Sequence, residues 1–186
     1  MSAGKEAEIM TGDKLDYLTL ATSSNDFLER VLREGIQPDA EKLAGWEFRG
    51  FNTLTLTTLL GFPKFKKGFY RDGADLRGYN VKIKPGGLAD PWIDVVKNGK
   101  SVKHGFYDVY PVRAEERDNL YPNSLLLNYA SRRNPAWDPS RVLRDYLVQP
   151  DPDNPDLYLG KAYLALGPRR IFVSFFVLER ENESIL

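Results

Sequence analysis

The chain has 186 residues, of which 42% are hydrophobic, which is enough to form one domain with a sizeable buried core. Lysine plus arginine and aspartate plus glutamate both number 26, so no net charge draws the protein toward nucleic acid or an anionic membrane. The absence of cysteine excludes disulfides and thiolate chemistry, and no run approaches the ~20 apolar residues that would span a bilayer.

The N-terminal part of the chain contains the best helix signal. Residues 1–23 have weak patterning and are predicted to form a flexible or loosely docked arm, with residues 17–20 as the candidate anchor. Ser24 or the asparagine that follows it can cap a short amphipathic helix over residues 26–34, and Gly35 is a natural stop. Residues 24–186 are expected to form one domain that includes this helix.

From residue 46 onward the sequence is a series of short alternating runs rich in aromatic and β-branched residues, which is typical of strands. The predicted strands cover residues 46–55, 68–71, 79–84, 92–97, 100–112, 124–131, 143–149, 157–166 and 171–180. About nine strands joined by short polar turns favour an all-β antiparallel meander. Because little helix is available to cover the edges, we expect closure into a barrel of about 8–10 strands. A two-sheet sandwich is the competing architecture.

The Asn98-Gly99 dipeptide lies between two of these runs and predicts a two-residue hairpin turn, because both residues tolerate positive φ. The expected register pairs Lys97 with Lys100, Val95 with Val102, and Ile93 with His104. Paired residues share a face of the sheet. The largely apolar face of this hairpin therefore continues along the second strand. It includes Phe106, Asp108 and Tyr110, which are predicted to point inward.

Two further strands show which of their faces is inward. The less polar face carries Tyr79, Val81 and Ile83 in one strand, and Leu125, Leu127 and Tyr129 in the other. Polar groups among the inward positions favour a lined cavity over a solid core. The first candidates for contact with a bound molecule are Tyr79, Val81, Phe106, Asp108, Tyr110, Leu127 and Tyr129.

The last predicted strand is apolar on both faces over residues 171–178. Such a strand is typical of a position covered on both sides. The helix over residues 26–34 could cover the outer face by packing on the barrel wall, or it could plug one end. A second copy of the chain in a homodimer is the alternative cover.

The order of elements in this chain resembles that of the calycins, the lipocalin-like barrels. A helix is followed by Ala44-Gly45-Trp46 and then by a meander that ends near Arg180. In those families a Gly-x-Trp near the first strand packs its indole at the closed end of the barrel, beneath an arginine from near the last strand. Here the glycine directly precedes the tryptophan, and the family's second motif is not matched. The resemblance implies a cup that binds a small hydrophobic molecule, with Trp46 and Arg180 as structural closures.

Two polar residues of the inferred inner face are candidates for chemistry. His104, the only histidine, could be a metal or haem ligand, a general base, or an ordinary hydrogen-bonded residue near the rim. Asp108 lies about 13 Å further along the strand at ~3.4 Å per residue, too far to orient the imidazole. A buried carboxylate must be neutral or paired, so Asp108 is expected to hold a polar head group or to meet Arg144 or Arg49.

Three other segments are better explained as structure than as sites. Residues 62–71 interleave aromatics with cations, as a membrane portal or nucleic-acid patch does, but in a neutral chain we predict inward aromatics and solvated lysines. The oxygen-rich loop 151–156 lacks the glycine and closing glutamate of an EF-hand. Residues 85–87 lack a phosphate-binding pattern. We therefore predict no metal and no cofactor.

The function favoured by these patterns is binding of a small, largely hydrophobic molecule inside the barrel. One alternative is an enzyme of the isomerase or cyclase type that uses Asp108, His104 and Tyr110 as acid and base. Another is an interaction or structural protein with a filled barrel. The polar first residues do not resemble a signal peptide, so we expect a cytoplasmic protein, although removal of a leader would leave a similar sequence. We expect neither a nucleic-acid partner nor stable membrane insertion.

Overall fold

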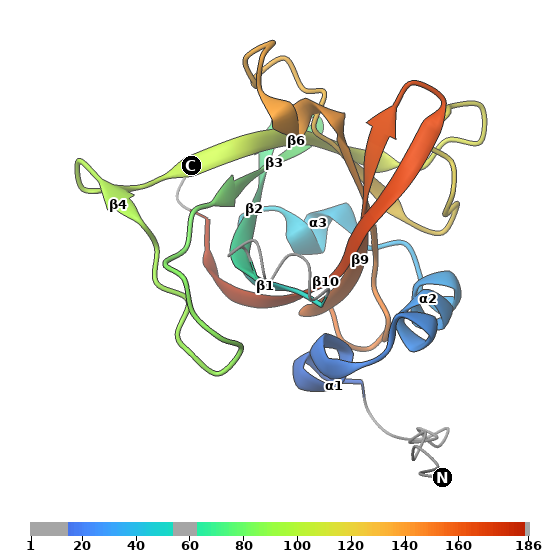
Figure 1. The fold of residues 1–186 in the computed structure, drawn as a ribbon, viewed down its shortest axis with the longest axis horizontal. Coiled ribbons are helices and arrows are strands. Elements are labelled where there is room, and N and C mark those ends of the chain that lie inside the picture. Colours follow the sequence, from blue (N-terminus) through green and yellow to red (C-terminus); the bar gives the residue numbers. More distant parts are fainter. Residues whose placement is uncertain (1–14, 54–62, 185–186) are drawn as a thin grey trace, which may run out of the picture.

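In the computed structural model, the described residues 15–53 and 63–184 form three short helices and a closed barrel (Figure 1). The helices are α1 (Tyr17–Thr22), α2 (Asn25–Glu34) and α3 (Ala40–Leu43). The barrel strands are β1 (Trp46–Asn52), β2 (Lys64–Asp72), β3 (Asp75–Val81), β6 (Lys103–Pro111), β7 (Leu125–Asn128), β8 (Leu143–Val148), β9 (Leu157–Leu166) and β10 (Arg169–Glu183). They follow the order β1-β10-β9-β8-β7-β6-β3-β2 around the ring, and neighbours are antiparallel. The predicted all-β antiparallel barrel is confirmed.

The helix predicted over residues 26–34 is confirmed as α2. The Ser24 side chain accepts a hydrogen bond from the Phe27 amide at 3.3 Å, and Gly35 ends the helix. The last residues of the predicted arm are docked where the expected anchor lies: Asp16 caps α1, and Leu20 is fully buried against the barrel. The rest of the predicted arm lies outside the described residues, as does the end of the first predicted strand.

The predicted hairpin turn is confirmed at Asn98 and Gly99, which have φ of 52° and 73°. It joins β4 (Val96–Lys97) to β5 (Lys100–Ser101), and the Val102 amide bonds to the Val95 carbonyl. The expected pairing of Ile93 with His104 is wrong. The hairpin leaves the barrel as a separate two-stranded flap, and His104 pairs with Asn80 of β3 instead.

Glycines on the barrel strands make room for large rings on the strands beside them. The register pairs Gly50 with Phe65, Gly68 with Tyr79, Gly78 with Tyr107, and Gly160 with Phe176. In each pair the ring lies over the glycine, where a Cβ atom would overlap it. This aromatic covering of strand glycines lets a narrow barrel hold rings that would otherwise collide with a neighbouring side chain.

One end of the barrel is filled and closed. Leu43 of α3 is fully buried there beside an aromatic cluster in which Phe48 contacts Phe69 and Tyr158 edge-on, with ring centroids 5.6 and 5.4 Å apart. In Figure 1, α3 is seen within the ring of strands. The helix that plugs the end is therefore α3, and α2 packs elsewhere.

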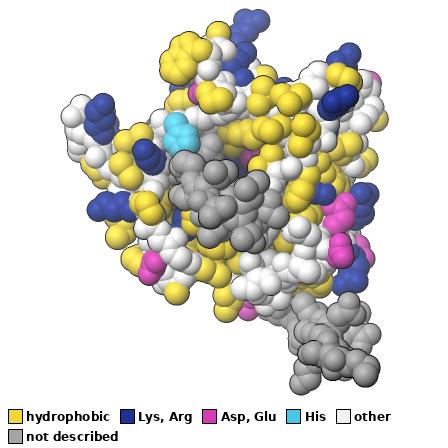
Figure 2. Space-filling view, in the orientation of Figure 1, with side chains coloured by type: hydrophobic (Ala, Val, Ile, Leu, Met, Phe, Trp, Pro, Cys, Tyr) yellow, Lys and Arg dark blue, Asp and Glu magenta, His cyan; other side chains and the backbone are white. Residues whose placement is uncertain are grey.

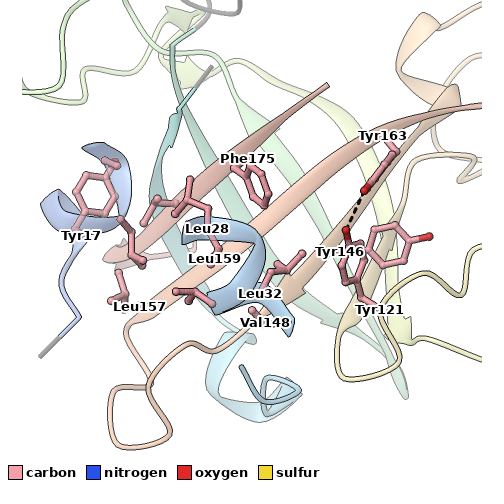
Figure 3. Close-up of a cluster of buried hydrophobic side chains, with 14 of the residues drawn as sticks. Tyr17, Leu28, Leu32, Tyr121, Tyr146, Val148, Leu157, Leu159, Tyr163 and Phe175 are labelled. Carbon is pink, nitrogen blue, oxygen red and sulfur yellow. Dashed lines mark hydrogen bonds between the residues drawn. The ribbon is translucent and has the colours of Figure 1, made fainter. Parts of the chain in front are cut away.

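The outer face of β8, β9 and β10 is covered by α1 and α2. Figure 3 shows Leu28 and Leu32 of α2 packed over this wall beside Phe175. Phe175 belongs to the outer cluster, whereas its neighbour Phe176 belongs to the interior cluster. This explains why the last strand is apolar on both faces around Phe175, whereas Ile171 and Phe172 near its start are 45% and 37% exposed. The predicted packing of the helix on the wall is confirmed.

A polar network fastens α2 to β9 within this layer. Glu29 accepts hydrogen bonds from Lys161 Nζ at 2.7 Å and from the Tyr121 hydroxyl at 3.1 Å. Burial alone would raise the pKa of Glu29. The hydrogen bond and charge of Lys161, the hydrogen bond from Tyr121 and the charge of Arg33 together outweigh burial and lower the pKa below its usual 4.5.

Gly78→Ala should destabilise the barrel, because the new methyl group would strike the Tyr107 ring and the Gly68 carbonyl. We expect a loss of about 1–3 kcal/mol in the free energy of unfolding, measured by urea denaturation. Gly87→Ala, at a loop glycine where a Cβ would meet only ordinary contacts, is the control and should be nearly neutral. Equal effects of the two substitutions would contradict the packing argument.

Glu29→Gln should lower the free energy of unfolding at pH 7 by about 1 kcal/mol. A carboxylate whose folded pKa is depressed stabilises the fold above its unfolded pKa, and this contribution is lost as pH falls through the folded pKa. The difference between variant and parent should therefore shrink between pH 7 and pH 3 in thermal unfolding. Glu34→Gln, at the exposed end of α2, is the matched control. A pH-independent difference would contradict the assignment.

Candidate functional site

The barrel contains a cavity of about 690 Å³ at the end opposite α3. Figure 2 looks onto this end, where hydrophobic side chains gather over the strands around the ring. The apolar side chains of its wall come from strands around the ring and from the flap; among them are Phe65, Val95, Val102, Leu143, Ala162, Val173 and Phe176. Polar lining residues include Asn52, Lys67, Asn80, His104, Asp145 and Ser174.

Lys67 is the central polar residue of this cavity. Its side chain is 3% exposed, and its ammonium lies 3.0 Å from Asp145 Oδ2 and 3.2 Å from Asn80 Oδ1. It also donates a hydrogen bond to the Tyr129 hydroxyl, which in turn donates to Asp145 Oδ2 at 3.0 Å. Lysine, tyrosine and aspartate therefore form a closed triangle of hydrogen bonds.

The Lys67–Asp145 ion pair crosses the lumen. Lys67 lies on β2 and Asp145 on β8, which stand four places apart in the ring of eight strands. Both residues occupy inward positions, because Phe69 and Leu147, two residues further along the same strands, lie in the interior cluster. The pair lies between the filled half of the barrel and the open half.

Aromatic rings surround the ammonium group. Lys67 Nζ lies 4.9 Å from the Tyr107 ring centroid, 5.1 Å from Tyr129, 5.2 Å from Phe176 and 5.4 Å from Phe65. Each distance falls within the range of cation–π attraction, which is stronger where water is excluded. The rings and the carboxylate together offset part of the cost of burying the charge.

Burial lowers the pKa of Lys67, and the nearby Asp145 carboxylate offsets only part of this effect. Burial also raises the pKa of Tyr129 well above 10, an effect that the Asp145 charge reinforces. Tyr129 therefore remains a protonated phenol at neutral pH and can donate a hydrogen bond. The triangle therefore combines an amine whose pKa is lowered, a phenol that donates a hydrogen bond and a carboxylate that accepts one.

The neighbouring Lys66 shows the opposite behaviour. It points to the outer side of β2, where its ammonium lies 3.1 Å from both Asp94 and Glu181. Burial disfavours its charge, but these two carboxylates outweigh burial and raise its pKa. Lys66 is not among the residues that line the cavity.

His104 lies among the lining residues and is itself exposed. The packing around its ring and the charge of Lys67 lower its pKa below the usual 6.5, so the imidazole is neutral at pH 7. Among the described residues, no group of three or more His, Cys, Asp or Glu side chains is placed to hold a metal ion. The structure therefore supplies no partners for the metal-ligand interpretation of His104.

The predicted inward direction of Phe106, Asp108 and Tyr110 is wrong. The buried residues of β6 are the alternate ones, Tyr107 and Val109 among them. Across from Gly78 and Asn80 of β3, β6 contains one extra residue, and Gly105 adopts a φ of +52° there. This β-bulge shifts the alternation by one position, which transfers every later side chain to the opposite face.

Asp108 consequently lies outside the cavity and its side chain is 41% exposed. It lies 3.6 Å from Arg77 and accepts a hydrogen bond from Ser131 at 3.3 Å. The partners predicted for it are wrong, because Arg144 pairs with Asp118 and Arg49 with Glu179. The structure does not bring Asp108, His104 and Tyr110 together.

Tyr79 also points outward, contrary to the prediction. It is fully buried between β3 and the C-terminal segment, where its hydroxyl donates to Glu47 at 2.7 Å and contacts Ser184 at 2.6 Å. Its neighbour Asn80, on the more polar face of this strand, points inward, where it lines the cavity and accepts a hydrogen bond from Lys67. Val81 does line the cavity.

The remaining predicted residues lie in the interior. Tyr129 lines the cavity, whereas Leu127 is packed in the interior cluster of the barrel. At the closed end, the Arg180 guanidinium lies 4.4 Å from the centroid of the Trp46 ring and donates to the Lys42 carbonyl at 2.8 Å. This contact matches the arrangement that the resemblance implies.

The sequence prediction missed Lys67, Asn80 and Asp145. The lysines of residues 62–71 were expected to be solvated, but those of β2 are buried. The available signal was positional: Lys67 lies midway between Phe65 and Phe69 on a strand with inward aromatics. Asp145 likewise lies between two leucines, so each charge occupies a core position in the alternation.

Comparisons with known proteins add no functional information. No protein-family model matches the chain, and a search of curated proteins gave no significant match. In the described part of the chain, no helix is long and apolar enough to cross a membrane.

Lys67→Met or Asp145→Leu should each lower the free energy of unfolding by about 3–5 kcal/mol, because each leaves one buried charge without its partner. The double variant should lose much less than the sum of the two, since no unpaired charge remains. Urea denaturation of all four proteins measures the coupling. Additive losses would contradict a mutually dependent pair.

Proposed function

We propose that the barrel binds a small, largely apolar molecule whose polar head group faces Lys67, as in a lipocalin-like carrier. The observation that carries this proposal is a cavity of about 690 Å³ with mainly apolar walls and a buried polar triangle. Ligand sites usually measure about 300–1,000 Å³ and combine apolar walls with a few polar groups that set orientation.

The arrangement of the barrel ends supports the same proposal. The closed end, with Trp46 under Arg180, is similar to that of the calycins, and the opposite end contains the cavity. A filled structural barrel is less well supported, because the cavity occupies the open half of the interior. A cytoplasmic location and the absence of a nucleic-acid partner remain predictions.

An enzyme is the second candidate, supported by one specific observation. Lys67, Tyr129 and Asp145 converge within hydrogen-bond distance inside a cavity, as acid–base groups do. This trio replaces Asp108, His104 and Tyr110 as the groups on which an enzymatic proposal would rest.

Ala162→Phe should lower affinity for a small apolar molecule at least about tenfold, or about 1.4 kcal/mol, because the ring would occupy the cavity wall. The measurement is a fluorescence titration with 1-anilinonaphthalene-8-sulfonate, beside native mass spectrometry for stoichiometry. The parent protein should bind one probe per chain. Ala165→Phe, at a position of the same strand that does not line the cavity, is the control and should bind like the parent.

Equal binding by all three proteins would place the probe on the surface and contradict the proposal. Mass spectrometry of an organic extract of the purified protein adds an independent test. A stoichiometric small molecule released on denaturation would support a carrier and identify the chemical class of its ligand.

A further inference from the structure

We propose that Lys67 condenses with an aldehyde or ketone group of the bound molecule to form a protonated imine. This inference rests on the proposed binding function and names the chemical class that the cavity takes. It assigns Lys67 a covalent role, beyond its ion pair with Asp145.

The amine of Lys67 lies where a molecule bound in the cavity would contact it. Lys67 and its partners Asp145, Asn80 and Tyr129 all line the cavity, so a molecule inside it lies against the whole triangle. An ion pair that served only to connect two strands could be covered completely by other side chains. Here the charged groups form part of the surface that a bound molecule would contact.

Lys67 differs from Lys66, its neighbour on β2, in how tightly it holds its proton. Both are buried, yet Lys66 faces two carboxylates outside the cavity and holds its proton more tightly than a free lysine. Lys67 faces one carboxylate and four rings and holds its proton less tightly. Each unit by which a lysine pKa falls raises the neutral fraction at pH 7 about tenfold, and only the neutral amine attacks a carbonyl.

The partners of Lys67 supply the proton transfers that this condensation requires. Asp145 accepts a proton from Nζ, and the freed electron pair forms a bond to the carbonyl carbon. Tyr129, which accepts a hydrogen bond from Nζ, passes a proton from the nitrogen to the carbonyl oxygen. Asp145 then returns its proton as the carbon–oxygen bond breaks and water leaves.

The product is an iminium ion beside the Asp145 carboxylate, so the ion pair of the free protein is preserved in the adduct. One water is released, and nothing is oxidised or reduced. Asn80, which bonds to Nζ at 3.2 Å, acts as a positioning residue that holds the amine toward the cavity.

The test uses decanal as the carbonyl probe, decan-1-ol as its non-reactive counterpart, and sodium cyanoborohydride to trap the imine. Intact mass and peptide mapping should show one reduced adduct per chain, at Lys67, at least about tenfold above any other lysine. Lys66→Met should react like the parent. Tyr129→Phe should slow adduct formation at least about tenfold.

The double variant Lys67→Met/Asp145→Leu leaves no unpaired charge and should form no adduct. Displacement of 1-anilinonaphthalene-8-sulfonate by decan-1-ol reports binding separately. If decan-1-ol does not bind the parent, the proposed function fails. If decan-1-ol binds but decanal gives no adduct, or gives adducts spread over surface lysines, the imine proposal is overturned while the binding function stands.

Discussion

The interior of this protein depends on one ion pair across the lumen of a barrel. Lys67 and Asp145 come from opposite strands, and their contact requires both to leave water. Such a pair is rarely a gain in stability over well-packed apolar side chains, because desolvation cancels much of the attraction. Its presence in an otherwise largely apolar interior is therefore not explained by stability alone.

Around this pair the barrel is divided into two halves with different chemistry. Toward α3, rings such as Phe48 and Phe69 fill the space, and strand glycines make room for large rings beside them. Toward the other end the packing opens into the cavity. The filled half packs closely beneath the polar triangle, and such packing holds the side chains of a site in place.

Most of the fold could be predicted from the sequence, but little of the candidate site could. Alternation, turn residues and the Asn98-Gly99 dipeptide led to a closed antiparallel barrel, because these signals are local. The inward face of β6 was misassigned because a bulge at Gly105 shifts the alternation, and a glycine does not disclose its φ. Lys67 was missed because the residue that makes its burial tolerable, Asp145, lies 78 positions away in the chain.

Because α3 closes one end of the barrel, a small molecule would exchange between the cavity and solvent through the other end. In the described part of the chain, the cavity lies at the end opposite the plug, so a bound molecule would enter and leave at that end. An elongated molecule whose head meets Lys67 would enter head first, with its tail nearest the opening. Recognition would then fall on the leading few atoms, and tails of different length could be accommodated equally well.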